Sequence, residues 1–136
     1  MSATGHATGM AGEFHAMEIL HRLGHQPALT LGNAKTIDIL SKAPSGKIYE
    51  VSVKAIRGGG KWGIGSENYT TYDKLVFMLF WYKSFNDIST HPETWIIPAA
   101  KAEEIKLPWH AQFGLYLYKE HMHLLEPYKN AWQHLA

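Results

Sequence analysis

The chain of 136 residues contains no cysteine, which excludes disulfide bonds, thiolate metal sites and a cysteine nucleophile. No apolar run approaches the ~20 residues that a membrane-spanning helix needs. Residues 1–10 have neither the basic start nor the apolar stretch of a signal peptide. Neither sign of charge dominates, because 13 lysines and arginines stand against 12 aspartates and glutamates. We therefore expect a soluble cytoplasmic protein that bulk electrostatics alone would not hold on nucleic acid.

Signatures of two common site types are absent or incomplete. The chain has 9 histidines, but no HExxH motif of a zinc enzyme. Residues 57–66 (RGGGKWGIGS) contain a literal GxGxxG and a Gly-Lys pair. Trp62 stands where a P-loop has serine or threonine, and Ile64-Gly65-Ser66 is a poor start for the helix of a dinucleotide-binding turn. The sequence thus argues against both nucleotide-binding motifs and against a zinc centre.

Apolar periodicity and turn residues predict an α/β fold with a mixed sheet flanked by helices. The eight-residue apolar run at 75–82 is typical of a central strand that is buried on both faces. The other predicted elements are a helix at 12–23 with Gly24 as its C-cap, a short strand at 29–31, a hairpin at about 35–42 and 47–56, a glycine-rich loop at 57–66, a short helix at 66–73, strands at 95–97 and 115–118 (the latter an edge strand), and helices from Pro98 and Pro127. We expect one domain over residues 11–136, preceded by a flexible tail at 1–10.

The second strand of the hairpin carries Glu50, Ser52 and Lys54 at alternate positions, so these side chains share one face. Asp38 on the first strand joins that face if the connecting loop has three or five residues, or a bulge; a four-residue loop sets it opposite Val51 on the apolar face. Carboxylates can hold Mg²⁺, and a lysine beside them can stabilise a phosphate under attack by water. The alternative is that the acids are solvated residues of an amphipathic hairpin.

Glu13 lies early in the first predicted helix. It shares a helix face with Met17 and Leu20, which is an unusual position for an acid. This position favours a functional site; the alternative is a first-turn acid that the helix dipole stabilises.

Together, Asp38, the strand ending in Ser52-Val53-Lys54 and Glu13 on a preceding helix resemble the PD-(D/E)XK nuclease superfamily, which has the restriction-endonuclease-like fold. The resemblance covers roughly residues 12–98. In that family the aspartate and the acid two residues before the lysine bind the metal, the lysine assists the attacking water, and a helix acid often joins them. The resemblance implies an endonuclease that acts on DNA with Mg²⁺ or Mn²⁺, in which Asp38 binds the metal and Lys54 assists water attack.

The chain departs from the family pattern at two places. Thr36-Ile37 stands where a proline often precedes the aspartate, and Ser52 stands where the second acid belongs. Strand geometry separates the Cα atoms of Glu50 and Lys54 by about 13 Å. Either Glu50 reaches in as the second metal ligand or Glu67 supplies it, as in restriction enzymes of the superfamily that carry a serine before the lysine. A third possibility is an inactive protein of the same fold that binds nucleic acid or a protein partner.

The glycine-rich loop directly follows the strand of Lys54. Its backbone N–H groups, Arg57 and Lys61 could bind phosphates, and Trp62 could stack on a base. Ser52 joins these three as a candidate substrate-binding residue. The alternative is a flexible connection between elements. A homodimer is a further expectation, because two copies would act on both DNA strands.

Overall fold

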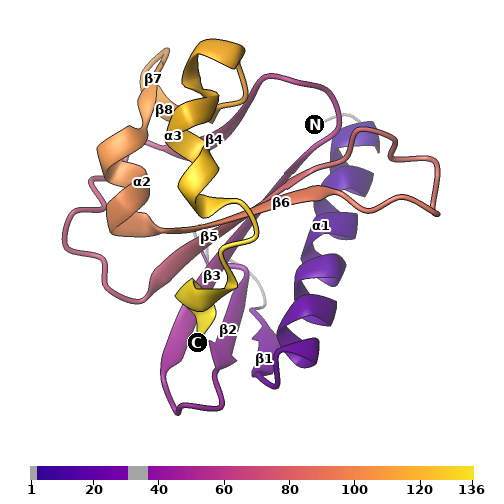
Figure 1. Ribbon diagram of the computed structural model, residues 1–136, viewed down its shortest axis with the longest axis vertical. Helices are drawn as coiled ribbons and strands as arrows, with labels where there is room; N and C mark the ends of the chain where they lie inside the picture. Colours follow the sequence, from indigo (N-terminus) through magenta and orange to yellow (C-terminus); the bar gives the residue numbers. More distant parts are fainter. Residues whose placement is uncertain (1–2, 31–36) are drawn as a thin grey trace.

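The computed structural model describes residues 3–30 and 37–136. The chain forms a long first helix, a five-stranded sheet and a smaller three-stranded sheet. Figure 1 shows the first helix lying beside the strands of the larger sheet. In chain order the elements are α1 (Ala3–Arg22), β1 (Gln26–Leu29), β2 (Ile39–Lys42), β3 (Ile48–Ile56), β4 (Lys61–Gly65), β5 (Leu75–Trp81), β6 (Glu93–Pro98), α2 (Ala99–Ile105), β7 (Leu107–Trp109), β8 (Gln112–Tyr116), η1 (Lys119–His121), α3 (Met122–Leu125), η2 (Glu126–Tyr128) and η3 (Trp132–Leu135). Leu31 and residues 35–36 of predicted strands, and residues 1–2 of the predicted tail, lie outside the described residues.

The larger sheet is mixed, as the sequence predicts. Its strand order is β1-β2-β3-β5-β6, in which β3 and β5 are parallel and the other neighbours are antiparallel. All residues of β5 from Leu75 to Phe80 are buried, because both faces of this strand are covered. Phe77 and Leu79 point into one core, and Met78 and Phe80 point into the other. The predicted central strand is therefore confirmed.

One face of the larger sheet is covered by α1 and by the end of the chain. Gly12 allows the helix to come close, since a Cβ built there would lie 2.8 Å from the Cβ of Ala55. Ala16 and Leu20, on the following turns, are fully buried against the sheet. Leu135 of η3 joins the same core. The close approach of α1 holds Glu13, the residue after Gly12, beside the sheet.

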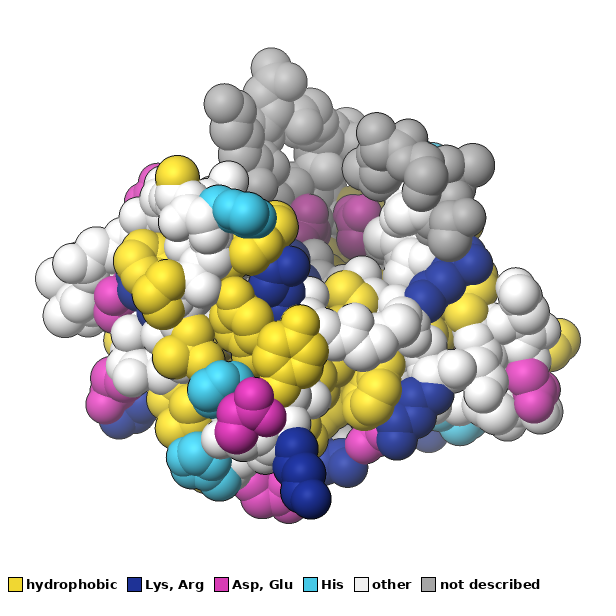
Figure 2. Space-filling view, turned by 90° about the horizontal axis from the view of Figure 1, so that it is seen from above, with side chains coloured by type: hydrophobic (Ala, Val, Ile, Leu, Met, Phe, Trp, Pro, Cys, Tyr) yellow, Lys and Arg dark blue, Asp and Glu magenta, His cyan; other side chains and the backbone are white. Residues whose placement is uncertain are grey.

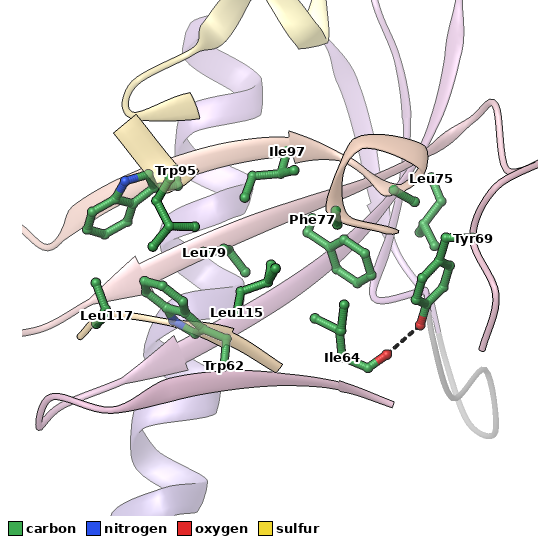
Figure 3. Packing of buried hydrophobic residues seen from close by; sticks show 13 residues of the cluster. Trp62, Ile64, Tyr69, Leu75, Phe77, Leu79, Trp95, Ile97, Leu115 and Leu117 are labelled. Carbon is green, nitrogen blue, oxygen red and sulfur yellow. Dashed lines mark hydrogen bonds between the residues drawn. The ribbon is translucent and has the colours of Figure 1, made fainter. Parts of the chain in front are cut away.

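The three-stranded sheet, in the order β4-β8-β7, covers the opposite face together with α2. Figure 3 shows inward side chains of β4 and β8 facing those of β5 and β6, with Trp62 and Trp95 at one end and Tyr69 at the other. The two indole rings are 5.2 Å apart at their centroids, and the Tyr69 hydroxyl donates to the Ile64 carbonyl over 2.5 Å. This second core holds the smaller sheet firmly in place.

The smaller sheet differs from its sequence prediction. In the expected glycine-rich loop, residues 57–60 and Ser66 bend, while residues 61–65 between them form β4. The strand at 115–118, expected at an edge, corresponds to β8 at 112–116, which is the central strand of the smaller sheet. The sequence did not predict β4 as a strand, because its alternation of apolar and polar residues is weak. Trp62 and Ile64 are buried on its inward face, but glycines occupy two of the alternate positions on the outward face.

The helices also differ in part from the prediction. Helix α1 begins at Ala3 and not at residue 12, so most of the segment expected as a loose tail is helical. Gly24, with φ +84°, follows the end of the helix as predicted. The helix expected at 66–73 is a turn, while α2 follows Pro98 as predicted. The last expected helix is replaced by two short 3₁₀ turns, η2 and η3. Within the described ranges, no helix is long and apolar enough to cross a bilayer.

Candidate functional site

The connection of the β2–β3 hairpin has one of the two lengths that favour Asp38 on the face of Glu50. Lys42 pairs with Ile48, so residues 43–47 form a connection of five residues. Leu40 pairs with Glu50 in the same register, and the pairing ends at Ile39 with Val51. Asp38 directly precedes this last pair.

Asp38 takes part in the ladder through both its backbone and its side chain. Its N–H donates to the Val51 carbonyl over 2.9 Å. Its carboxylate oxygen Oδ2 accepts a hydrogen bond of 2.7 Å from the Val53 N–H, in place of a backbone carbonyl. Burial raises the pKa of Asp38, against the lowering effects of the Val53 hydrogen bond and of the Lys54 charge. The carboxylate is therefore fixed in direction and lies within the field of the lysine.

Glu13 brings a second carboxylate to this place from α1. Burial raises the pKa of Glu13, and the charge of Asp38 raises it further, while His6 lowers it. Two neighbouring carboxylates resist ionising together, and a divalent cation would relieve their repulsion. Asp38 is thus coupled electrostatically to Glu13 and to Lys54, and these three residues are here called the acid–lysine group. His6 was missed because it lies in the segment expected as a tail, although it precedes Glu13 by about two helical turns.

Ser52 lies in β3, two residues before Lys54 of this group. It is fully buried, and its Oγ has no hydrogen-bond partner within the described part of the chain. A buried hydroxyl without a partner costs about 1–3 kcal/mol, so such an atom calls for an explanation.

Glu50 and Glu67, the two predicted second ligands, both act on Tyr72. The Tyr72 hydroxyl donates to Glu67 over 2.7 Å. This hydrogen bond is the main reason for the raised pKa of Tyr72, followed by desolvation and by the charges of Glu67 and Glu50. Glu13 is the carboxylate whose pKa the charge of Asp38 raises. Among residues 3–30 and 37–136, no three His, Asp or Glu side chains gather closely enough to hold a metal ion by themselves.

The three predicted substrate contacts have different surroundings. Arg57 donates from Nε to the Thr8 hydroxyl over 2.6 Å and lies 3.7 Å above the Phe85 ring. Lys61 is partly exposed on β4. Trp62 is only 1% exposed, and its Nε1 donates to the Phe80 carbonyl over 3.0 Å. The expected stacking of Trp62 on a base does not fit this burial, because the core covers the indole.

Acidic and basic side chains lie close together on one face of the molecule. Figure 2 shows acidic side chains on this face with a lysine or arginine side chain close to them and hydrophobic side chains nearby. Carboxylate and cationic groups together suit a phosphate ester with a metal ion better than they suit an apolar ligand.

Comparisons with known proteins identify the fold. No protein-family model matches the chain, and no curated protein matches it in sequence. Among solved structures, the bacterial homing endonuclease I-Ssp6803I matches with a TM-score of 0.60 and 13% sequence identity, over 99% of this chain and 92% of that chain. At this identity the likeness is one of fold. The chain therefore has a mixed α/β fold with helices on a mixed sheet, and it shares this architecture with a homing endonuclease.

Proposed function

We propose that this protein is a metal-dependent endonuclease of the PD-(D/E)XK type that acts on DNA. The observation that carries the proposal is the acid–lysine group: the Val53 N–H holds the carboxylate of Asp38, which directly precedes β2, the charge of Asp38 raises the pKa of Glu13 of α1, and the charge of Lys54 of β3 acts to lower the pKa of Asp38. The fold shared with a homing endonuclease supports the same reading. Sequence and three-dimensional arrangement thus point to phosphodiester hydrolysis.

The residues of the acid–lysine group fit a hard divalent cation such as Mg²⁺ or Mn²⁺. Burial raises the pKa of both carboxylates, and the charge of Asp38 raises the pKa of Glu13 further. When both are ionised, they offer oxygen ligands and a negative charge that a divalent cation would balance. Asp38 would hold the ion with Glu13, in the place that the sequence suggested for Glu50 or Glu67. When bound, the ion would supply a water of lowered pKa and offset charge on the phosphate.

The chain's own groups have separate tasks in this mechanism. The Val53 N–H fixes the direction of the Asp38 carboxylate. Lys54 carries a positive charge beside it and is suited to orient the attacking water or to stabilise the negative oxygens of the phosphate. Arg57, which follows on the chain, would hold a neighbouring phosphate.

A cleavage assay tests the proposal. Plasmid and linear DNA are incubated with wild-type protein in Mg²⁺, in Mn²⁺ and in chelator, beside Asp38→Asn, Glu13→Gln and Lys54→Met. Loss of Lys54 is expected to slow cleavage on the order of 100-fold, because a charge aimed at the phosphate is removed. Glu104→Gln, a change of an exposed acid on α2, should cleave like the wild type. The proposal fails if the wild type cleaves no DNA with either ion, or if Lys54→Met cleaves equally well.

Ser52 favours a second candidate function. A serine in the position of the usual second acid fits a nuclease fold that has lost catalysis and binds nucleic acid or a protein partner. This alternative predicts DNA binding without cleavage and no rise of the melting temperature with Mg²⁺. A homodimer belongs to the catalytic proposal, since two sites would address two strands; light scattering with and without duplex DNA measures it.

A further inference from the structure

The outer face of the smaller sheet is built to carry large side chains flat against it. Gly63 of β4 pairs with Gly114 of β8. A Cβ on Gly63 would lie 3.3 Å from the Trp109 ring, and one on Gly114 would lie 3.3 Å from the Lys61 side chain. The two glycines thus leave space that an indole and a lysine stem occupy, on the face opposite to the Trp62 core.

Aromatic rings and a cation follow one another along this face. The Lys61 Nζ lies 3.7 Å from the centroid of the Trp109 ring, and Lys61 pairs across the strands with Tyr116. The Tyr116 ring lies 5.4 Å from that of Tyr118 and 6.0 Å from that of His121. These five residues are called the aromatic row. Tyr118 is 48% exposed, while Trp109, Lys61 and Tyr116 are each partly exposed, so solvent reaches the row.

The strands that carry most of the aromatic row have charges of one sign. The segments 57–66 and 106–119, which contain β4, β7 and β8, include Arg57, Lys61, Lys106 and Lys119 but no aspartate or glutamate. This contrasts with the near balance of the whole chain; the nearest acids along the chain, Glu67, Glu104 and Glu120, flank these segments. Lys106 is held by Glu103, whereas Lys61 makes no ion pair within the described residues. The face is therefore complementary to a polyanion.

We propose that the aromatic row binds single-stranded nucleic acid, with unpaired bases stacked on Trp109 and Tyr118. Aromatic rings interleaved with cations are the means by which proteins hold single strands, because every base offers a flat face and every nucleotide a phosphate. A base on Trp109 displaces the Lys61 ammonium from the ring and leaves it free to pair with the adjacent phosphate. In a duplex the base faces are covered by their neighbours, so the row discriminates against it.

This binding goes beyond the proposed hydrolysis and does not depend on it. It uses the outer face of the smaller sheet, and it requires neither a metal ion nor the acid–lysine group. It is therefore measured in chelator, where a metal-dependent nuclease is silent, and a negative cleavage assay leaves its outcome unaffected.

Fluorescence anisotropy with labelled oligothymidylate, in chelator and at fixed salt, measures the affinity. Wild-type protein should bind this single strand at least about ten-fold more tightly than a labelled duplex. Trp109→Ala should weaken binding about ten-fold or more, and Trp109→Phe should retain most of the affinity because a flat ring remains. Tyr118→Ala, at an exposed position, tests the row independently of any effect of Trp109 on folding. Phe14→Ala, a change of a 59% exposed ring on α1, should bind like the wild type.

Salt dependence separates the role of Lys61 from that of the rings. Lys61→Gln should lower the slope of log affinity against log salt by roughly 0.7, since one phosphate contact on a single strand is lost. Trp109→Phe should leave that slope unchanged. The proposal is overturned if the wild type does not bind the single strand, if duplex binds equally well, or if Trp109→Ala and Tyr118→Ala both bind with wild-type affinity.

Discussion

At the scale of single residues, Ser52 carries the buried polar atom nearest in sequence to Lys54 of the acid–lysine group. Its hydroxyl is fully buried and has no partner among the described residues, and it lies two positions before Lys54. A stable protein tolerates a buried hydroxyl of this kind where a water or ligand makes the missing hydrogen bond, or where the lost free energy of folding is small. The two explanations differ in what they predict for changes at this position.

Ser52→Asp places a carboxylate two residues before Lys54, where the proposed PD-(D/E)XK pattern has its second acid. In chelator we expect the variant to be less stable than the wild type by about 1–3 kcal/mol, because an acid is added to a buried place near Asp38. With Mg²⁺ we expect its melting temperature to rise by more than that of the wild type, since a third carboxylate strengthens cation binding. Thermal unfolding at several Mg²⁺ concentrations measures both effects.

Ser52→Ala is the matched control for the aspartate variant. Removing an unsatisfied hydroxyl should be neutral or should stabilise by up to about 1 kcal/mol. A melting temperature of Ser52→Asp that is insensitive to Mg²⁺ would speak against a cation at this place. The same result would favour the binding-only alternative.

At the scale of elements, the contact between α1 and β3 positions Glu13. Gly12 makes it possible, because a Cβ there would lie only 2.8 Å from the Cβ of Ala55 and 3.5 Å from Val53. The hairpin supplies Asp38 and Lys54 by its register, but the second carboxylate depends on how closely a separate helix lies on the sheet.

Gly12→Ala should therefore separate α1 from β3. We expect a loss of about 1–3 kcal/mol from overpacking, partly offset by up to ~1 kcal/mol of helix propensity. Cleavage should fall further than the lost stability explains, since Glu13 moves with the helix. Urea unfolding and the cleavage assay at a temperature where the variant is fully folded measure the two effects separately.

Gly9→Ala provides the control on the same helix. A Cβ at Gly9 meets nothing within 4 Å, so the change should stabilise by up to ~1 kcal/mol and leave cleavage unaltered. If both alanine variants gain stability, the close packing of α1 is not what holds Glu13 in place.

The two parts of the acid–lysine group were not equally predictable from sequence. Asp38 and Lys54 follow from strand alternation and from loop length, which are local properties of one hairpin. Glu13 was singled out by its helix face, but its meeting with Asp38 depends on the packing of α1, which no local pattern encodes. Glu67 was assigned to a helix that is a turn, and its bond to Tyr72 is equally nonlocal.

At the scale of the whole molecule, the sequence predicts where strands occur better than it predicts which strands pair in one sheet. The apolar run of β5 marks a central strand wherever it occurs, and the mixed sheet followed from the order of elements. The second sheet was not foreseen because β4, β7 and β8 are short and rich in glycine or proline, and the pairing of β4 with β8 spans a long stretch of sequence. The aromatic row could not be predicted either, because it depends on the pairing of β4 with β8, which sets Lys61 beside Tyr116, and on the contact of Lys61 with Trp109.

The end of the chain closes the core on the α1 side through buried hydrogen bonds. His25, 5% exposed, contacts Ser41 Oγ through Nδ1 over 2.8 Å and the Leu135 carbonyl through Nε2 over 2.7 Å. The Tyr49 hydroxyl donates to the Ala136 carbonyl over 2.5 Å. Leu135 itself is 1% exposed. The last residues of the chain are therefore held in two ways: the Leu135 side chain packs in the core, and the carbonyls of Leu135 and Ala136 accept hydrogen bonds.

This arrangement predicts that stability changes at its two sides are not additive. Leu135→Ala should cost about 2–5 kcal/mol through the lost apolar contact, and His25→Ala about 1–3 kcal/mol through the unpaired carbonyl. Once either change has released the segment, the other contact is already lost, so the double variant should cost less than the sum by about 0.5–3 kcal/mol. Urea unfolding of the wild type, both single variants and the double variant measures this coupling. Strictly additive losses would mean that His25 and Leu135 stabilise the fold independently, and that the end of the chain does not dock as one unit.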